Sequence, residues 1–369
     1  MSRMPIQVWD YRDEYEAERE AIAAAMDRVF RSGRLILGEN VRELEERFSA
    51  YCGVRYGVGV GNGTDAIFLA LKAIDIGPGD EVITVSNTAV PTVAAIVSTG
   101  AAARFVDIEP STYLMDTAKL EAAITPRTKC ILVVHLFGQC VRIEDVQDVA
   151  NRHGLRVVED CAQAHGAERR GVKAGAMSDV AAFSFYPTKI LGGYGDGGMV
   201  VTNDEALAAR LRRIRTYGME RVYYAEEHGY NSRLDELHAA ILLTKMDKLD
   251  GYIRRRREIA SCYERDLADT PLTLPATQEG NEHAYYLYVA RHPERDRIIE
   301  ELAQRDIVVN VSYPWPIHIM RAYEWLGYEE GDLPETEAAA KEIFSLPMYP
   351  SLSEEAQTKV CRALHEILG

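Results

Sequence analysis

Short apolar runs alternate with stretches of helical spacing along most of the chain. Runs rich in β-branched residues predict strands at Tyr56–Val60, Glu81–Val85, Ala103–Asp107, Cys130–Val134, Arg156–Asp160, Val180–Phe185 and Met199–Thr202. Apolar residues at helical spacing lie between several of these runs, at 64–75, 116–124, 143–153 and 204–216. Strands that alternate with helices of this length predict an α/β fold whose mostly parallel central sheet is covered on both faces.

The last predicted strand departs from this pattern. The segment that joins Val180–Phe185 to Met199–Thr202 ends in Gly197 and Gly198, so that the new strand begins soon after the old one ends. Such a connection cannot hold a helical crossover. We therefore expect Met199–Thr202 to lie antiparallel to its neighbour.

Further elements are predicted before and after the sheet. Helical spacing occurs at 12–32, at about 40–51, from Arg233 to Ala268, at 296–305 and at 353–367, and strand-like runs occur at Tyr285–Arg291 and Ile307–Tyr313. The long helical stretch from Arg233 is expected to break near Gly251 and to join a large unit to a small one. We predict a large domain at 1–250, which includes the N-terminal helices, and a small α+β domain at 251–369.

Composition and charge narrow the class of protein. The 369 residues are 47% hydrophobic and 27% charged, which is typical of a globular protein with a sizeable core. The net charge of −15 disfavours binding to nucleic acid or to an acidic membrane surface, because both require a basic surface. The basic run Arg254–Arg257 lies in a helical stretch and is expected to be a solvated helix face.

The cysteines and the first residues indicate the compartment. Six cysteines show no Cys-x-x-Cys spacing and no accompanying histidine pattern, so we expect neither a metal site nor a disulfide framework. Residues Met1–Asp10 lack the apolar core of a signal peptide, and no run reaches the length of a membrane span. We expect a cytoplasmic protein.

Lys189 and Asp160 are the residues that indicate the chemistry. Lys189 precedes a glycine-rich segment, and Asp160 ends an apolar strand 29 residues earlier. A pyridoxal-phosphate enzyme needs an amine that holds the cofactor's aldehyde as a Schiff base and a carboxylate that keeps its pyridine nitrogen protonated. Each residue has a plainer interpretation, a helix cap for Asp160 and a loop lysine for Lys189, but together they favour a pyridoxal-phosphate enzyme.

A phosphate would also need a binding turn. Gly61–Asp65 (GNGTD) follows a predicted strand and opens a helix, where free N–H groups and the helix dipole favour a dianion. The turn lacks the glycine spacing of a dinucleotide fold and the Gly-Lys-Ser/Thr of a P-loop. An ordinary strand-to-helix turn remains equally compatible with these residues alone.

Several motifs, in the same order and spacing, resemble the DegT/DnrJ/EryC1/StrS nucleotide-sugar aminotransferases. They are Gly61–Ala66 (GNGTDA), Glu159–Ala167 (EDCAQAHGA), Ser184–Lys189 (SFYPTK), Gly229–Asp235 (GYNSRLD), Tyr313–His318 (YPWPIH) and Ser345–Pro350 (SLPMYP). The resemblance runs from about residue 30 to the carboxyl terminus. It implies fold type I of the pyridoxal 5'-phosphate enzymes.

The resemblance also implies roles for single residues. Lys189 is the expected catalytic lysine, and the cofactor is expected to contact Gly63, Thr64, Asp160, Gln163, Ser184 and Asn231. Asn231 would reach the phosphate of a neighbouring subunit, which would make the protein a homodimer with shared active sites; a capping or loop role is its alternative. Tyr186, Tyr313 and His318 are expected on the substrate side, and a structural role near Trp315 is the alternative for His318.

One position departs from the family pattern. The loop Ser86–Thr92 has Ala89 where the family usually has an aromatic residue stacked on the cofactor ring. Either the register shifts, or another group covers that face of the ring. The segment Gly192–Gly198 (GGYGDGG) slightly favours 3-keto over 4-keto sugars as substrates.

The resemblance implies amino transfer from an amino acid, expected to be L-glutamate, to a 3-keto or 4-keto nucleoside-diphosphate deoxysugar, expected to carry dTDP. Two alternatives stay open. A related sugar dehydratase would have histidine in place of Lys189, and a pyridoxal-phosphate-binding regulator would show no turnover. The sequence does not specify the sugar or the carbon that is aminated.

Overall fold

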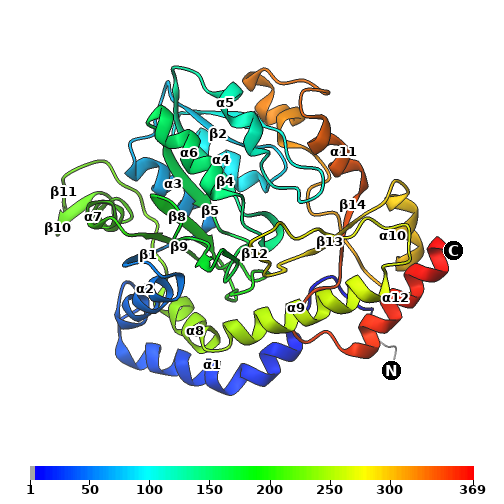
Figure 1. Ribbon diagram of the computed structural model, residues 1–369. Coiled ribbons are helices and arrows are strands. Elements are labelled where there is room, and N and C mark those ends of the chain that lie inside the picture. Colours follow the sequence, from blue (N-terminus) through cyan, green and yellow to red (C-terminus); the bar gives the residue numbers. More distant parts are fainter. Residues whose placement is uncertain (1–4) are drawn as a thin grey trace.

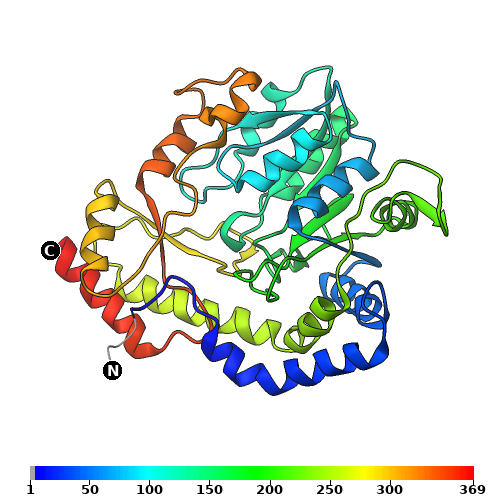
Figure 2. The same cartoon turned by 180° about the vertical axis from the view of Figure 1, so that it is seen from behind.

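A seven-stranded sheet forms the centre of the molecule, with helices on both of its faces (Figures 1 and 2). The computed structural model describes residues 5–369, so Met1–Met4 of the segment tested for a signal peptide lie outside the described residues. The sheet order is β1-β9-β8-β5-β4-β2-β3. Its strands are β1 (Tyr56–Val60), β2 (Glu81–Val85), β3 (Ala102–Val106), β4 (Thr128–Val134), β5 (Arg156–Asp160), β8 (Val180–Ser184) and β9 (Gly198–Thr202).

Strand direction follows the sequence expectation. Strands β3, β2, β4, β5 and β8 run parallel to one another, whereas β9 is antiparallel to both β8 and β1. Because β1 and β8 flank the reversed strand, they point the same way as the rest. The carboxyl ends of β1, β2, β4, β5 and β8 therefore lie along one edge of the sheet, where α/β proteins place their ligands.

Helices cover this sheet and extend below it. The segments are α1 (Arg12–Ser32), α2 (Glu39–Cys52), α3 (Gly63–Ala73), α4 (Val90–Ser98), α5 (Leu120–Ala123), α6 (Ile143–His153), α7 (Glu205–Ile214), α8 (Glu236–Met246) and α9 (Leu249–Asp266). Helix α3 packs on β8, β9 and α4, and α2 packs on β1 and α8. Helix α1 lies beside α8 at the bottom of Figure 1.

Two helix predictions need correction. The break in the long helical stretch lies between Met246 and Leu249, so Gly251 is inside α9. Helix α4 has no counterpart among the predicted helices. Its sequence (VPTVAAIVS) is almost entirely apolar because it is packed against β3 and α3, so it lacks the polar face that marks an amphipathic helix.

The C-terminal part has its own hydrophobic cluster within residues 259–367. Its elements are β13 (Tyr288–Arg291), α10 (Arg295–Ala303), α11 (Pro334–Glu342), β14 (Ile343–Leu346) and α12 (Glu354–Leu368). The cluster is formed by α9, α10, α12 and the β13–β14 pair, whereas Tyr323 and Ala339 pack against the larger core. The domain boundary near residue 250 stays a prediction.

The strand predicted at Ile307–Tyr313 is wrong. This segment makes single bridges at Ile307, to Ile6, and at Asn310, to Ser345. The side chains of residues 307–310 alternate between buried and exposed, as in a strand, but the single bridges to Ile6 and to Ser345 of β14 do not form a continuous ladder.

Small elements complete the structure. Two-residue strands β6 (Glu168–Arg169), β7 (Val172–Lys173) and β12 (Asn281–Glu282) form one sheet, and β10 (Met219–Arg221) with β11 (Tyr224–Ala225) forms a hairpin. Short 3₁₀ turns lie at Thr117–Lys119, Leu136–Gly138, Ile317–Ile319 and Arg321–Leu326. Across residues 5–369, we find no helix with the length and apolarity that crossing a membrane requires.

Candidate active site

A cavity of about 580 Å³ opens at the carboxyl edge of the central sheet. Seven of the residues predicted for the site line it: Gly63, Thr64, Asp160, Gln163, Ser184, Tyr186 and Lys189. They come from the N-terminus of α3, the loop after β5 and the end of β8 with the loop that follows. The fold thus brings residues that are up to 126 positions apart (63 to 189) into one space.

Lys189 reaches the cavity from the loop after β8. Its backbone N–H donates to Tyr186 O at 2.8 Å, which fixes the turn that carries it. Its Nζ lies 4.5 Å from the centre of the Tyr286 ring, and the hydroxyls of Tyr286 and Thr188 are 2.9 Å apart. The lysine is half-buried, so its amine is held by an aromatic face at the cavity rather than extended into solvent.

Asp160 is the last residue of β5 and is 5% exposed. Its Oδ1 accepts from the Ala162 N–H at 3.1 Å and its Oδ2 accepts from the Thr92 hydroxyl at 2.8 Å. Burial raises the pKa of Asp160, and these two hydrogen bonds oppose that rise. Residues 161–167 form turns, so the helix-cap alternative for Asp160 is wrong.

The turn after β1 leads directly into α3. Asn62 is the N-cap, and its side chain accepts from the Asp65 N–H at 2.8 Å. Gly63 and Thr64 occupy the first helical positions, where backbone N–H groups have no partner within the helix. A Cβ on Gly63 would lie 2.6 Å from the Ser184 Cβ, so only glycine lets the helix end approach β8 this closely.

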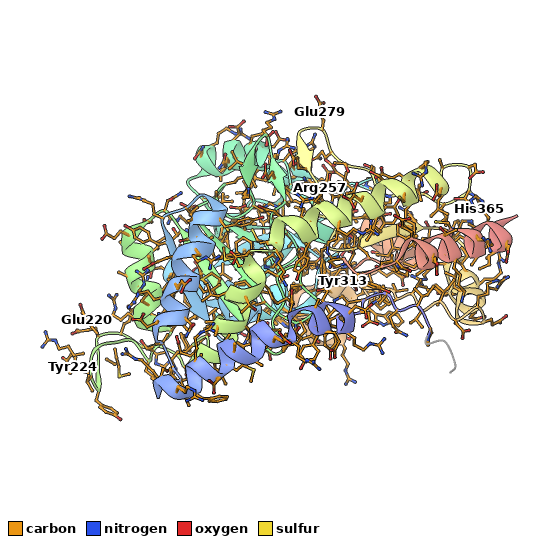
Figure 3. The ribbon with its side chains drawn as sticks, turned by 90° about the horizontal axis from the view of Figure 1, so that it is seen from below. Glu220, Tyr224, Arg257, Glu279, Tyr313 and His365 are labelled. Atoms are coloured by element: carbon orange, nitrogen blue, oxygen red, sulfur yellow. The ribbon has the colours of Figure 1, made fainter. Side chains whose placement is uncertain are left out.

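Gln163 and Tyr313 form one side of the site. Gln163 Oε1 accepts from the Phe137 N–H at 2.8 Å, so its amide nitrogen points the other way and donates to the Tyr313 hydroxyl. The Tyr313 ring stacks on Phe137 with ring centres 6.0 Å apart. Tyr313 thus contacts Gln163, a cavity-lining side chain, and it lies near the middle of the molecule in Figure 3.

His318 lies away from the cavity. It is fully buried, its Nδ1 is 2.8 Å from the Ser86 hydroxyl, and its Nε2 is 3.1 Å from Glu337 Oε1. Both ring nitrogens are therefore engaged within the protein. This geometry matches the structural alternative, although the partners are Ser86 and Glu337 rather than the exposed Trp315.

Asn231 is exposed and lies outside the cavity of its own chain. The next residue, Ser232, is buried: its hydroxyl donates to Asp65 Oδ2 at 2.6 Å and accepts from the Gly61 N–H at 2.9 Å. Ser232 therefore anchors the segment that carries Asn231 to the turn at the start of α3.

Comparison with known proteins decides the family. The DegT/DnrJ/EryC1/StrS aminotransferase family model matches residues 16–365. The chain belongs to this family. It is a pyridoxal-phosphate-dependent sugar aminotransferase, as the sequence predicts.

Three relatives illustrate the range of the DegT/DnrJ/EryC1/StrS family near this chain. A dTDP-3-amino-3,4,6-trideoxy-alpha-D-glucose transaminase of Micromonospora megalomicea subsp. nigra is 54% identical, covering 99% of each chain. A pleiotropic regulatory protein of Geobacillus stearothermophilus is 44% identical, covering 98% of each chain. The crystal structure of S. venezuelae DesV in complex with a ketimine intermediate superposes with a TM-score of 0.97 at 42% identity, covering 99% of this chain and 98% of that one.

The residues fit the cofactor of this aminotransferase family. A buried carboxylate, a helix N-terminus and a lysine face one cavity, which are the three groups needed for a pyridinium nitrogen, a phosphate and an aldehyde. Ala89 lines the same cavity, so no aromatic side chain is contributed at that position. Which group covers that face of the cofactor ring stays open.

Among the site residues that the sequence did not predict are Thr88, Thr92 and Tyr286. Thr88 and Thr92 line the cavity, with their hydroxyls 2.9 Å apart, and Tyr286 lies against Lys189. Their residue types carry no chemical signature of their own. The one available signal was the position of both threonines in Ser86–Thr92, the loop that departs from the family pattern.

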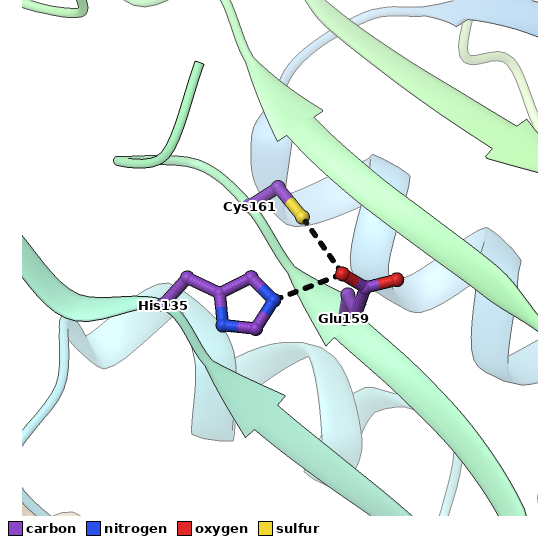
Figure 4. A group of neighbouring side chains, drawn as sticks. All are labelled: His135, Glu159 and Cys161. Atoms are coloured by element: carbon purple, nitrogen blue, oxygen red, sulfur yellow. Dashed lines mark hydrogen bonds and ion pairs between the residues drawn. The ribbon is translucent and has the colours of Figure 1, made fainter. Parts of the chain in front are cut away.

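Behind Asp160, three neighbouring side chains form a buried polar group, His135, Glu159 and Cys161 (Figure 4). The Val141 N–H donates to His135 Nδ1, so Nε2 carries the ring proton and donates to Glu159 at 2.9 Å. Glu159 also accepts from Cys161, the N–H groups of Gly175 and Met177, and the Ser178 hydroxyl.

The ligand atoms of this group are already used. Burial alone would raise the pKa of Glu159, but its hydrogen bonds, led by the one from His135, lower it below the ordinary value. A metal ion would have to displace several of these donors. The group therefore serves to hold the strand end that carries Asp160 against the loop at residues 175–178.

Proposed function

We propose that the enzyme transfers the amino group of L-glutamate to the 3-keto carbon of a dTDP-linked deoxysugar. The observation that carries the proposal is the meeting of Lys189, Asp160 and the α3 N-terminus in one cavity. The relatives support the acceptor: the Micromonospora protein is named for a dTDP-3-amino sugar, and a transaminase of Aneurinibacillus thermoaerophilus for another.

The chain's own residues divide the chemistry. Pyridoxal phosphate, when bound, supplies an aldehyde and an electron-accepting ring. Lys189 Nζ would bind the aldehyde in the resting enzyme and, once released by substrate, would carry the proton at the reacting carbon. Asp160 would hold the protonated pyridine nitrogen as its ionised partner, and its burial would strengthen that ion pair. These roles are part of the proposal.

The remaining predicted residues bind and orient. Gly63, Thr64 and Ser184 hold the phosphate through N–H and hydroxyl donors, and Gln163 contacts the phenolic side of the ring. Tyr186, which is 51% exposed at the cavity mouth, and Tyr313 face the sugar nucleotide. His318 acts indirectly by holding its segment to Ser86 at the end of β2.

We also propose that two copies of the chain share their active sites. Asn231 is exposed, and the nearby β10–β11 hairpin projects from the body at one end of the molecule, with Tyr224 at its tip region (Figures 1 and 3). Val222 and Tyr223 are 88% and 94% exposed. A second copy would cover this apolar tip and receive Asn231 at its phosphate turn.

A cytoplasmic location is part of the same proposal. All six cysteines are free thiols and five of them are buried, which suits a reducing compartment.

The test is transfer of a labelled amine. Purified protein is incubated with pyridoxal phosphate, ¹⁵N-glutamate and a 3-keto dTDP-deoxysugar, and the products are analysed by mass spectrometry. We expect one ¹⁵N atom in the sugar product and none with Lys189→Ala, while Lys129→Ala, an exposed lysine of β4, keeps full activity.

Other outcomes would replace the proposal. A deoxygenated keto-sugar without nitrogen would indicate a dehydratase. No turnover of either half-reaction by cofactor-loaded protein would favour a regulator, the function named for the Geobacillus relative. Activity on a 4-keto sugar but not on a 3-keto sugar would place the aminated carbon at C4 instead of C3.

A further inference from the structure

A short chain of hydroxyls leads from the loop after β2 to the buried carboxylate. Thr88 Oγ1 lies 2.9 Å from Thr92 Oγ1, and the Thr92 hydroxyl donates to Asp160 Oδ2 at 2.8 Å. All three residues are at least 95% buried and line the cavity. Building on the proposed function, we propose that Thr92 is a positioning residue that orients Asp160 toward the pyridine nitrogen of the cofactor and keeps it ionised.

The directions of these hydrogen bonds follow from the groups themselves. An ionised carboxylate only accepts, so the single proton of Thr92 is committed to Asp160. Thr92 Oγ1 is then free only to accept, and Thr88 is the donor of the second bond. Both hydrogen bonds therefore run in the same direction, from Thr88 to Thr92 and from Thr92 to Asp160, and each strengthens the next.

The carboxylate is held at two points. The Ala162 N–H occupies Oδ1 at 3.1 Å and Thr92 occupies Oδ2, so the plane of the carboxylate is fixed by one backbone donor and one side-chain donor. Each oxygen retains a further lone pair for a ligand in the cavity. Without Thr92, rotation of the side chain would be limited at one oxygen only.

The backbone of α4 sets the position of Thr92. Ala89 is the N-cap of α4, Thr92 is three residues later, and the Thr92 N–H donates to Ala89 O at 3.1 Å. A β-branched side chain in a helix has few χ1 rotamers, so the hydroxyl is aimed before any ligand binds. The same turn carries Ala89. Its small side chain leaves Thr88 and Thr92 next to the cavity.

The Thr92 hydroxyl opposes the effect of burial on the pKa of Asp160. Burial raises the pKa of Asp160, and the hydrogen bonds from Ala162 and Thr92 are the largest effects that lower it again. A neutral Asp160 would lose its attraction for a protonated pyridine nitrogen. Thr92 thus acts on the cofactor through Asp160, without needing to touch the ring.

The experiment compares Thr92→Val, which removes the hydroxyl at constant shape, with Thr92→Ser, which keeps it. Each variant is loaded with pyridoxal phosphate that is ¹⁵N-labelled at the ring nitrogen, and the ¹⁵N chemical shift is followed against pH. The dissociation constant of the cofactor is measured by fluorescence titration. Thr84→Val is the control, because Thr84 is a fully buried threonine of β2 whose hydroxyl has no hydrogen-bond partner among the described residues.

For Thr92→Val we expect the ring nitrogen to lose its proton at a lower pH than in the wild type and the dissociation constant to rise by about tenfold or more, the effect of one hydrogen bond to a charged group. Thr88→Val should show the same changes to a smaller extent. Thr92→Ser and Thr84→Val should stay close to the wild type, with circular dichroism confirming that each variant is folded.

Two results would overturn the inference: a ring-nitrogen titration in Thr92→Val equal to that of the wild type, or a Thr92→Ser variant as impaired as Thr92→Val. Asp160→Asn separates this failure from failure of the proposed function. If Asp160→Asn leaves the ¹⁵N shift unchanged, Asp160 does not face the ring, and the proposed site itself is wrong.

Discussion

At the scale of single residues, the buried carboxylate of Asp160 lowers the stability of the cofactor-free protein. Asp160 is buried, and burial raises its pKa above the ordinary value of 3.8. In cofactor-free protein the charge of Lys189 and the hydrogen bonds from Ala162 and Thr92 offset only part of this rise in pKa. The residue that the proposed chemistry needs is therefore a residue that costs stability until the cofactor binds.

Because of this cost, we expect Asp160→Asn to raise the stability of the cofactor-free protein by an amount that depends on pH. The amide oxygen can still accept from Ala162, and the amide nitrogen can donate to a rotated Thr92 hydroxyl, so the replacement fits the site. We expect the cofactor-free variant to have a higher free energy of unfolding than cofactor-free wild type at pH 7.5, measured by urea denaturation.

The sign follows from linkage. Because the pKa is higher in the folded state, the folded protein binds the proton more tightly, and the wild type regains stability as pH falls through that folded pKa toward 3.8. The difference between the variant and the wild type should therefore narrow as the pH is lowered. A variant that is less stable than the wild type at pH 7.5, or a difference that grows at low pH, would contradict this.

The residue scale also shows what sequence can and cannot give. Lys189 and Asp160 were predicted because their chemistry and their place after apolar runs are visible in the sequence. His318 was assigned to the substrate side by the family resemblance, and the sequence does not show that both of its ring nitrogens are engaged within the protein. Thr92 was missed because a threonine acts there only through its distance to Asp160, which is set by the packing of α4.

At the scale of elements, the sheet was predictable and its connections less so. Apolar runs marked each strand of the central sheet, and the short glycine-rich connection marked β9 as antiparallel. The missing helix α4 and the false strand at Ile307–Tyr313 have one cause: periodicity reports which face is buried, and both segments are defined instead by which neighbours are free to pair or pack.

Helix α2 depends on a cap from a distant element. Glu236, the first residue of α8, is 2% exposed and accepts from the backbone N–H groups of Gly38, Asn40 and Val41 and from the Asn40 side chain. Its carboxylate satisfies the free N–H groups at the start of α2 and faces the positive end of the helix dipole. Adjacent residues 33–37 approach Asp235 through a bridge at Ile36.

We therefore expect Glu236→Ala to lower the free energy of unfolding by about 2–4 kcal/mol, because it leaves several buried donors unsatisfied. Glu39→Ala is the matched control: Glu39 lies in the same first turn, is exposed and forms a surface ion pair with Arg42, so its removal should cost less than about 1 kcal/mol. Equal losses in urea denaturation of the two variants would show that the buried cap is not what stabilises this end of α2.

At the scale of the whole molecule, the exposed β10–β11 hairpin and the exposed Asn231 are the features that bear on assembly. The β10–β11 hairpin exposes Val222 and Tyr223 almost completely, and Asn231 is exposed close to the chain's own phosphate turn. Nothing in the periodicity of the sequence predicted the hairpin, since its two strands are three and two residues long and bury little. Its proposed partner is a second copy of the chain.

Shared sites predict complementation between inactive subunits. In a dimer of Lys189→Ala with Asn231→Ala, one of the two sites combines an intact Lys189 with an intact Asn231 from the other subunit. We expect amino-transfer activity to rise above that of both parent proteins after unfolding and refolding them together.

The control for this experiment mixes Lys189→Ala with Asp160→Asn, because both residues line the cavity of one chain. Each site of that mixed dimer contains one damaged residue, so we expect its activity to stay at the level of the parent proteins. Activity of the Asn231 mixture no greater than the mean of its parents would contradict site sharing.

The most direct test of the account concerns the bond between the enzyme and its cofactor. Cofactor-loaded protein is treated with borohydride, which makes the bond between Lys189 Nζ and the cofactor's aldehyde carbon permanent, and is then digested and mapped by mass spectrometry. We predict one pyridoxyl phosphate label per chain, on the peptide that contains Lys189. A label on another lysine, or none on this peptide in protein that retains its cofactor, would contradict the account.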